Sequence, residues 1–270
     1  MAKVIAFANH KGGVAKTTIT TSVADALARD GYEVLVVDMD PQANATKLLY
    51  SFDDAPSGTI EQVLEGRLSI AQAIIGDTQV KGVDLVGATL LLDGVQKKMQ
   101  TSPFASTSAL KKALDVLHDA YDVILIDTRP ALDFLTANAL FAADVVFVPV
   151  ESGSKLALLG TDDMLRFIAE ARAVNPRLEF GAAILTRHDN RKKLCKITAE
   201  AVKGFYGRVL DASLPIAEDI RKAQVLGQTV LQYDRQLNAS NQVVDMAREI
   251  AAISGLQKRI ADSADEVLEA

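Results

Sequence analysis

The sequence has few of the residues that mark several protein classes. Cys195 is the single cysteine among 270 residues. One cysteine excludes an internal disulfide and any metal centre built from several cysteines of one chain. No hydrophobic run approaches the roughly 18–20 residues that a membrane-spanning helix needs. The first residues also lack the charged and then apolar layout of a secretory signal. We therefore expect a cytoplasmic protein.

Positive charge is also scarce. Lys and Arg number 29 against 35 Asp and Glu, so the formal net charge is −6. This balance argues against a surface coated in nucleic-acid-binding charge. The distribution is uneven, because residues 187–222 carry nine Lys or Arg against five Asp or Glu. Charge alone leaves two interpretations of this segment open, a solvated helix face or a local binding surface.

Short runs of Val, Ile and Leu alternate with stretches of helical periodicity. We predict strands at 3–8, 33–38, 83–87, 122–127, 144–150 and 179–186, and helices at 16–30, 60–75, 106–120, 156–174 and 192–206. Runs that are continuously apolar indicate strands covered on both faces, hence a mainly parallel sheet. The alternation predicts a doubly wound α/β fold flanked by helices. We expect one domain over residues 1–270, with a helical C-terminal segment at about 240–268.

A glycine-rich turn follows the first predicted strand directly. Residues 11–18 read Lys-Gly-Gly-Val-Ala-Lys-Thr-Thr. Gly12 and Gly13 let backbone N–H groups point at phosphate oxygens without a Cβ in the way, and the helix that starts near Lys16 adds its dipole. Lys16 would neutralise the β- and γ-phosphates, and the hydroxyl of Thr17 would bind Mg²⁺. The pattern predicts a nucleoside-triphosphate site.

This turn departs from the ordinary P-loop, because His10 and Ala15 stand where that pattern has its two glycines. With its second lysine at the front, it resembles the deviant Walker A box of the ParA/MinD family of dimerising ATPases. In that family the early lysine, here Lys11, crosses a dimer interface to the partner's nucleotide. The resemblance implies a P-loop NTPase fold, the cofactors ATP and Mg²⁺, and ATP-binding residues Lys11, Gly12, Gly13, Val14, Ala15, Lys16, Thr17 and Thr18.

A second motif ends the second predicted strand. It begins at Asp38 and reads Asp-Met-Asp-Pro-Gln-Ala-Asn, and carboxylates just past such a strand lie at the ligand-binding edge of an α/β sheet. The run is similar to the family's D-x-D-P-Q-[GA]-N segment. The resemblance gives Asp40 the task of positioning the attacking water, so we predict Lys11, Lys16 and Asp40 as catalytic. Asp38 is expected either to hold the water shell of Mg²⁺ or to brace the loop.

Asp127 closes an apolar strand, as the aspartate of a Walker B motif does. It would hold Mg²⁺ through a water and hydrogen-bond Thr17, so the predicted metal residues are Thr17, Asp38 and Asp127. The family usually continues with a small residue and two prolines, whereas this chain has Arg129 before Pro130. Three roles stay open for Arg129: it narrows the turn, reaches a phosphate or reaches the partner subunit.

The resemblance continues over about residues 3–252 and is closest to the short, Soj-like ParA partition ATPases. Pro215 falls in a segment whose backbone lies against adenine in that family. Arg191 matches a family position in the segment after the sixth predicted strand. Asp219 replaces an arginine that often contacts DNA in the family. The predicted DNA-binding residues are Arg191, Lys192, Lys193, Arg221 and Lys222.

The resemblance implies an ATP-dependent homodimer that binds DNA without sequence preference. Slow hydrolysis, stimulated by a ParB-like or cargo-adaptor protein, would drive partition of a plasmid, a chromosome or another cargo on the nucleoid. A metabolic ATP-dependent ligase of the dethiobiotin synthetase type is the alternative from another class, and a MinD-like positioning ATPase is a third. The acidic residues at 262–269 would be repelled by anionic lipid, so no membrane partner is expected.

Overall fold

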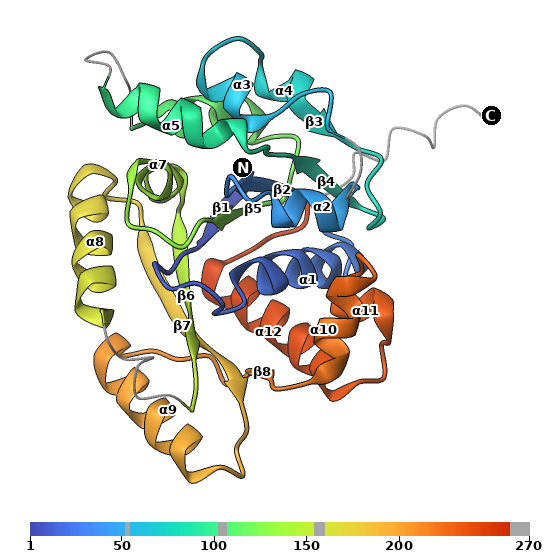
Figure 1. The fold of residues 1–270 in the computed structure, drawn as a ribbon, viewed down its shortest axis with the longest axis vertical. Coiled ribbons are helices and arrows are strands. Elements are labelled where there is room, and N and C mark those ends of the chain that lie inside the picture. Colours follow the sequence, from blue (N-terminus) through green and yellow to red (C-terminus); the bar gives the residue numbers. More distant parts are fainter. Residues whose placement is uncertain (52–54, 102–106, 154–159, 260–270) are drawn as a thin grey trace, which may run out of the picture.

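A computed structural model describes residues 1–51, 55–101, 107–153 and 160–259. Its centre is an eight-stranded sheet in the order β3-β4-β2-β5-β1-β6-β7-β8, parallel throughout except for β3, which pairs antiparallel with β4 (Figure 1). The strands are β1 (Lys3–Phe7), β2 (Val34–Met39), β3 (Ile74–Ile75), β4 (Val83–Val86), β5 (Val123–Thr128), β6 (Val145–Glu151), β7 (Glu179–His188) and β8 (Leu214–Pro215).

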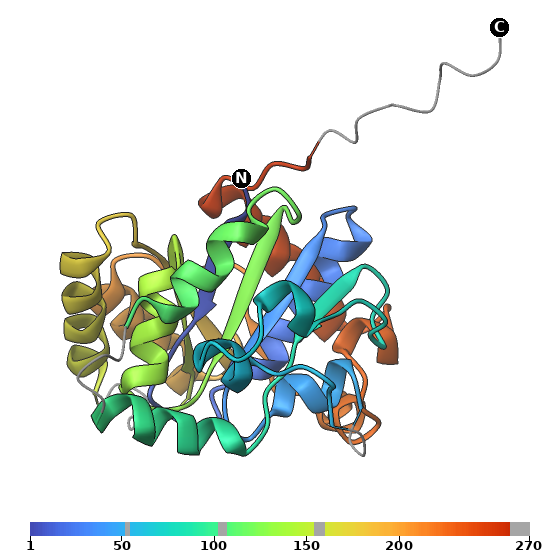
Figure 2. The ribbon, with the colours of Figure 1, turned by 90° about the horizontal axis from the view of Figure 1, so that it is seen from above.

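Helices cover both faces of the sheet (Figures 1 and 2). One face is covered by α1 (Lys16–Arg29), α2 (Asn44–Leu49), α10 (Glu218–Val225), α11 (Val230–Tyr233) and α12 (Asn238–Ser254). The other is covered by α3 (Ile60–Leu64), α4 (Ile70–Ala73), α5 (Leu91–Thr101), α6 (Ala109–Leu114) with the 3₁₀ turn η1 (Asp115–Leu117), α7 (Phe134–Ala142), α8 (Thr161–Val174) and α9 (Lys193–Tyr206). In the described ranges, no helix is long and apolar enough to cross a membrane.

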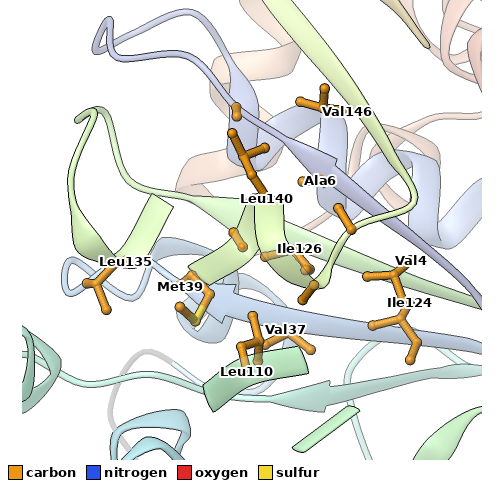
Figure 3. Packing of buried hydrophobic residues seen from close by; sticks show 14 of the residues in the cluster. Val4, Ala6, Val37, Met39, Leu110, Ile124, Ile126, Leu135, Leu140 and Val146 are labelled. Carbon is orange, nitrogen blue, oxygen red and sulfur yellow. The ribbon is translucent and has the colours of Figure 1, made fainter. Parts of the chain in front are cut away.

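The central strands are apolar on both faces because helices bury both. Val4 and Ala6 of β1, Val37 of β2 and Ile124 of β5 pack with Leu140 of α7 in one of two hydrophobic clusters (Figure 3). The residues that alternate with them, such as Ile5 and Leu125, point to the opposite cluster under α1 and α12. Burial on both sides explains why these strands are continuous runs in the sequence.

The topology fixes where a ligand can bind. Strand β1 lies between β5 and β6, and the chain leaves it toward β2, which lies beyond β5. The later strands β6, β7 and β8 follow on the other side of β1. Open α/β sheets bind ligands at the carboxyl ends of the strands where the order reverses in this way. The turn after β1 and the ends of β2 and β5 meet at that point.

The six predicted strands are confirmed, and so are the helices at 16–30 and 192–206. The helix expected at 60–75 is wrong: α3 ends before Gly66, whose φ of 71° is left-handed, and the segment continues as α4 and β3. Within 107–120 the expected helix is present as α6 and η1, and residue 106 lies outside the described residues. The helix predicted at 156–174 begins at Thr161, and 156–159 lie outside the described residues. The C-terminal helix runs over Asn238–Ser254 and ends at Gly255, with φ of 64°, and 260–268 lie outside the described residues.

Candidate nucleotide site

Hydrogen bonds of Asn9 hold the turn between β1 and α1 in place. The side chain of Asn9 donates to the carbonyl of Pro149 in β6 at 2.7 Å and accepts from the backbone N–H of Lys11 at 3.0 Å. Gly13 has φ of 75° and Ala15 has φ of 64°, so the loop is curled in the way that lets N–H groups point inward. A Cβ placed at Gly12 or Gly13 would meet no described atom within 4 Å, which leaves open space for phosphate.

Lys16 lies at the centre of this loop and is 7% exposed. Its Nζ donates to the carbonyl of Lys11 at 3.1 Å. Burial lowers the pKa of Lys16, while the nearby carboxylates of Asp127 and Asp40 act in the opposite direction. The ammonium of Lys16 is therefore hydrogen-bonded to a neutral carbonyl, with two carboxylates nearby. A bound phosphate could replace that carbonyl as its partner.

Asp127 and Asp38 lie side by side at the ends of β5 and β2. Thr17 donates to Asp127 Oδ2 at 2.6 Å, and Thr20 donates to Oδ1 at 3.3 Å. Burial, reinforced by the neighbouring Asp38, raises the pKa of Asp127. Two fully buried carboxylates beside each other, with a threonine hydroxyl at hand, are a donor set that fits a hard divalent cation such as Mg²⁺. The described residues contain no cluster of three or more His, Cys, Asp or Glu, so water and phosphate would have to complete the shell.

Asp38 is already occupied by its own loop. Its Oδ1 accepts from the backbone N–H of Asp40 at 3.0 Å, and its Oδ2 accepts from the N–H and the hydroxyl of Thr46 at 2.9 and 2.8 Å. The Thr46 hydroxyl also accepts from the N–H of Ala88 at 2.9 Å. Burial raises the pKa of Asp38 against these bonds. Of the two roles left open for Asp38, the geometry favours bracing the loop.

Asp40 lies at the mouth of the site, opposite the P-loop. Its Oδ1 accepts from the backbone N–H of Gln42 at 2.9 Å. Together with Lys16, Thr17 and Thr128 it lines a pocket of about 480 Å³. Asp40 is 7% exposed, and among the described residues its turn uses Oδ1 and leaves Oδ2 without a hydrogen bond. This is a suitable place for a group that orients a water.

The pocket continues into a larger one at the base end. This second pocket, of about 920 Å³, shares Gly13, Ala15 and Thr18 with the first and is closed by Pro215. Sequence reasoning missed Gln224 of α10, which lines both pockets and donates to the Thr18 hydroxyl at 2.7 Å. The two pockets together offer an elongated site with phosphate-binding and apolar ends.

Arg129 lies in a network outside the P-loop. Its guanidinium donates to Gln96 of α5 and lies 3.3 Å from Asp93 and 3.4 Å from Asp133. Asp133 also caps α7 by accepting from two backbone N–H groups. Of the three roles open for Arg129, holding the turn after Asp127 is the one that these contacts support.

The predicted DNA-binding residues lie on two neighbouring elements, the start of α9 and helix α10. Arg191 is 90% exposed, but its guanidinium is paired with Asp189 at 3.0 Å. Lys222 lies 3.3 Å from Asp219. Lys192, Lys193 and Arg221 are exposed. The structure thus brings these residues to one region beside the base end of the site, although two of the five share their charge with carboxylates of the same turn.

Comparisons with known proteins agree with this geometry. Residues 2–180 match the family model described as an AAA domain. The chain is 35% identical to the chromosome partitioning protein ParA of Caulobacter vibrioides, over 92% of this chain and 93% of that protein. It is 33% identical to the sporulation initiation inhibitor protein Soj of Bacillus subtilis, over 93% and 99%.

A solved structure of cobyrinic acid a,c-diamide synthase from Mycobacterium smegmatis, with bound ATP analog and magnesium, superimposes with a TM-score of 0.81. It is 30% identical and covers 92% of this chain and 93% of that one. The family expected from the Lys11–Thr18 loop, the Asp38–Asn44 run and Asp127 is confirmed by these matches. The chain belongs to the ParA/MinD family of P-loop ATPases.

Proposed function

We propose that this protein is an ATP-dependent dimerising ATPase that binds DNA without sequence preference and positions a cargo with a ParB-like or cargo-adaptor partner. The observation that carries the proposal is the convergence of Lys16, Thr17 and Asp40 on one pocket. Asp127 accepts a hydrogen bond from Thr17, and the backbone carbonyl of a second lysine, Lys11, accepts from Lys16. The relatives named for chromosome partitioning supply the class of cargo. The protein would act in the cytoplasm, on the nucleoid.

Each residue has a defined task in this proposal. The N–H groups of the loop and the ammonium of Lys16 bind the β- and γ-phosphates, which replace the Lys11 carbonyl as the partner of Nζ. Thr17 and Asp127 hold Mg²⁺, which supplies charge neutralisation between the phosphates. Asp40 orients the attacking water, and Asp38 keeps the Asp40 turn in place. Pro215 lies against the base.

Lys11 is the residue that makes dimerisation part of the proposal. Lys16 already binds the phosphates at its own loop. The second lysine, Lys11, would therefore bind the nucleotide of a neighbouring subunit. Burial lowers the pKa of Lys11, and the carboxylate of Glu151 partly opposes that effect. A site completed only by the partner copy also explains why basal hydrolysis should be slow.

DNA binding is compatible with the negative net charge. Nonspecific binding depends on the local field of Lys and Arg near phosphates and only weakly on the total charge. Two copies joined face to face would bring two sets of Arg191, Lys192, Lys193, Arg221 and Lys222 onto one surface. ATP would therefore raise DNA affinity through the dimer.

The test compares Lys11→Ala with Lys16→Ala. Lys16→Ala should abolish ATP binding because the phosphates lose their buried cation, whereas Lys11→Ala should retain binding and lose the ATP-dependent dimer. Light scattering with a non-hydrolysable ATP analogue and Mg²⁺ measures the dimer, and filter retention of random-sequence duplex at low salt measures DNA binding. A wild-type protein that stays monomeric under saturating analogue, or that gains no DNA retention with ATP, contradicts the proposal.

A metabolic ATP-dependent ligase remains the second candidate. It is favoured by the fold match to a cobyrinic acid a,c-diamide synthase at 30% identity. Such an enzyme activates a carboxylate of a small molecule and needs no second subunit to complete its phosphate site. Retained ATP turnover in Lys11→Ala at the wild-type rate, together with no dimer, would favour this class.

A further inference from the structure

Arg187 adopts a backbone conformation that is unusual for its residue type. Its φ is 50°, which lies in the left-handed region and costs an L-residue about 1–2 kcal/mol. It is also the extra residue of a bulge, because Thr186 pairs with Leu214 and His188 with Pro215 while Arg187 is skipped. Bulges re-aim a side chain and occur often beside functional sites. Here the bulge lies near the carboxyl end of β7, next to the nucleotide site, and changes the direction of the Arg187 side chain.

The side chain lines a pocket with two other cations. This pocket, of about 350 Å³, is formed by Arg187 of β7, Lys192 at the start of α9 and Arg221 of α10. Glu151 at the end of β6 is the single carboxylate among its described lining residues, and it pairs with Arg187 at 3.1 Å. Three elements distant in sequence therefore converge on one pocket with an excess of positive charge.

The backbone adds to the same field. Leu194 and Cys195, in the first turn of α9, also line the pocket. That 14-residue helix begins without a side-chain cap among the described residues. The positive end of its dipole lies at this first turn, which borders the pocket. Lys192 and Arg221 form no ion pair within the described ranges. Their charge is available to a ligand, whereas Arg191 and Lys222 are paired with Asp189 and Asp219.

We propose that Arg187, Lys192 and Arg221 form a pocket for a phosphate of the DNA backbone, with Arg187 as its central contact. The proposal rests on the DNA-binding function proposed above and changes its residue set. Arg187 is added, and Arg191 and Lys222 are removed because Asp189 and Asp219 pair with them. The same pocket adjoins the base end of the nucleotide site, since Arg187, Ile216 and Arg221 line both. A phosphate of a bound nucleotide is therefore the second source of the same chemistry.

Arg187→Gly is the informative variant. Glycine adopts φ of 50° without strain, so the side chain is removed from a backbone that keeps its shape. Lys203→Ala, which removes an exposed lysine near the other end of α9, is the matched loss of one positive charge. Arg187→Lys keeps the charge in the pocket. Thermal unfolding and titration with a fluorescent ATP analogue check the fold and the nucleotide site of each variant.

The assay is fluorescence anisotropy of a labelled short random-sequence duplex, with the ATP-bound protein, across a salt series. One lost phosphate contact lowers the slope of log affinity against log salt by about 0.9, roughly eightfold in affinity at 0.1 M salt, and a duplex that contacts both subunits of the dimer loses about twice that slope. We expect this loss in Arg187→Gly, a smaller loss in Arg187→Lys and less than twofold in Lys203→Ala. ATP-analogue affinity should be unchanged in Lys203→Ala, and the ATP-analogue affinity of Arg187→Gly decides between the two sources of phosphate.

Three other results are distinguishable. If the wild-type protein shows no ATP-dependent binding to the duplex, the proposed function itself fails. If the wild type binds and Arg187→Gly behaves as Lys203→Ala does, DNA binding stands and the pocket is overturned. If Arg187→Gly loses affinity for the ATP analogue, the pocket serves a nucleotide phosphate and its assignment to DNA is overturned.

Discussion

Arg129→Ala separates a structural role of this arginine from a role on the nucleotide. The structure places its guanidinium on Gln96, Asp93 and Asp133, away from Lys16. Its removal leaves Asp93 paired with Lys97 at 2.9 Å. Asp133 keeps the two N–H groups that it caps at 3.1 and 3.2 Å. The side-chain oxygen of Gln96 loses its donor, whereas Asp93 and Asp133 each lose one of several partners.

The expected cost is therefore that of one charge-assisted hydrogen bond at a site where the arginine side chain is 24% exposed. Such bonds contribute about 1.5–3 kcal/mol when buried, and partial exposure reduces this to about 1–2 kcal/mol. Urea unfolding followed by circular dichroism, without nucleotide, measures it. Gln96→Ala removes the acceptor of this bond and leaves the donor in place. The double variant should lose less stability than the sum of the two single variants, because both substitutions break the same Arg129–Gln96 hydrogen bond.

If Arg129 instead contacted the phosphates, its removal would lower the affinity for ATP and leave the free energy of unfolding unchanged. Titration of Arg129→Ala with a fluorescent ATP analogue should give an affinity within about twofold of the wild type, because no contact of Arg129 belongs to the P-loop. A tenfold loss of affinity, equal to about 1.4 kcal/mol, with an unchanged free energy of unfolding would refute the structural assignment.

The strands were predictable because each is buried on both faces. Residues such as Val36, Leu125 and Val148 are 0% exposed, so the sequence has no polar positions to interrupt the pattern. Five helices, α2, α5, α7, α10 and α11, were not predicted. In α7 most positions are apolar and buried, so no polar face reveals a helical period. The sequence at 60–75 keeps helical apolar spacing across Gly66, and only the left-handed backbone there shows the break.

The placement of the site residues was predictable where it is local in sequence. The P-loop, the Asp38–Asn44 run and Asp127 each read as a motif because the strand before them fixes their place at one sheet edge. Contacts between distant segments could not be predicted. Asn9 reaches Pro149 across 140 residues, and Gln224 reaches Thr18 across 206. Arg187 was hidden for another reason, since a bulge leaves no mark in residue spacing and this one carries no glycine.

Two further variants test the P-loop and the role of Asp40. Asp40→Ala should bind ATP and form the dimer, while phosphate release falls by ~10²–10⁴ because a water-orienting carboxylate is lost; turnover within twofold of the wild type would remove Asp40 from that role. Ala15→Gly should stabilise the nucleotide-free protein. Ala15 has φ of 64°, which costs an alanine about 1–2 kcal/mol, whereas glycine loses about 0.5–1 kcal/mol through its freer unfolded chain. The net gain is about 0.5–1 kcal/mol by urea unfolding. Ala252→Gly, at an exposed position inside α12, has no such strain to relieve and should lose about 0.5–1 kcal/mol. The opposite signs of the two identical substitutions measure the strain at Ala15, and a loss of stability in both would show that the loop relaxes out of the left-handed conformation when no phosphate is bound.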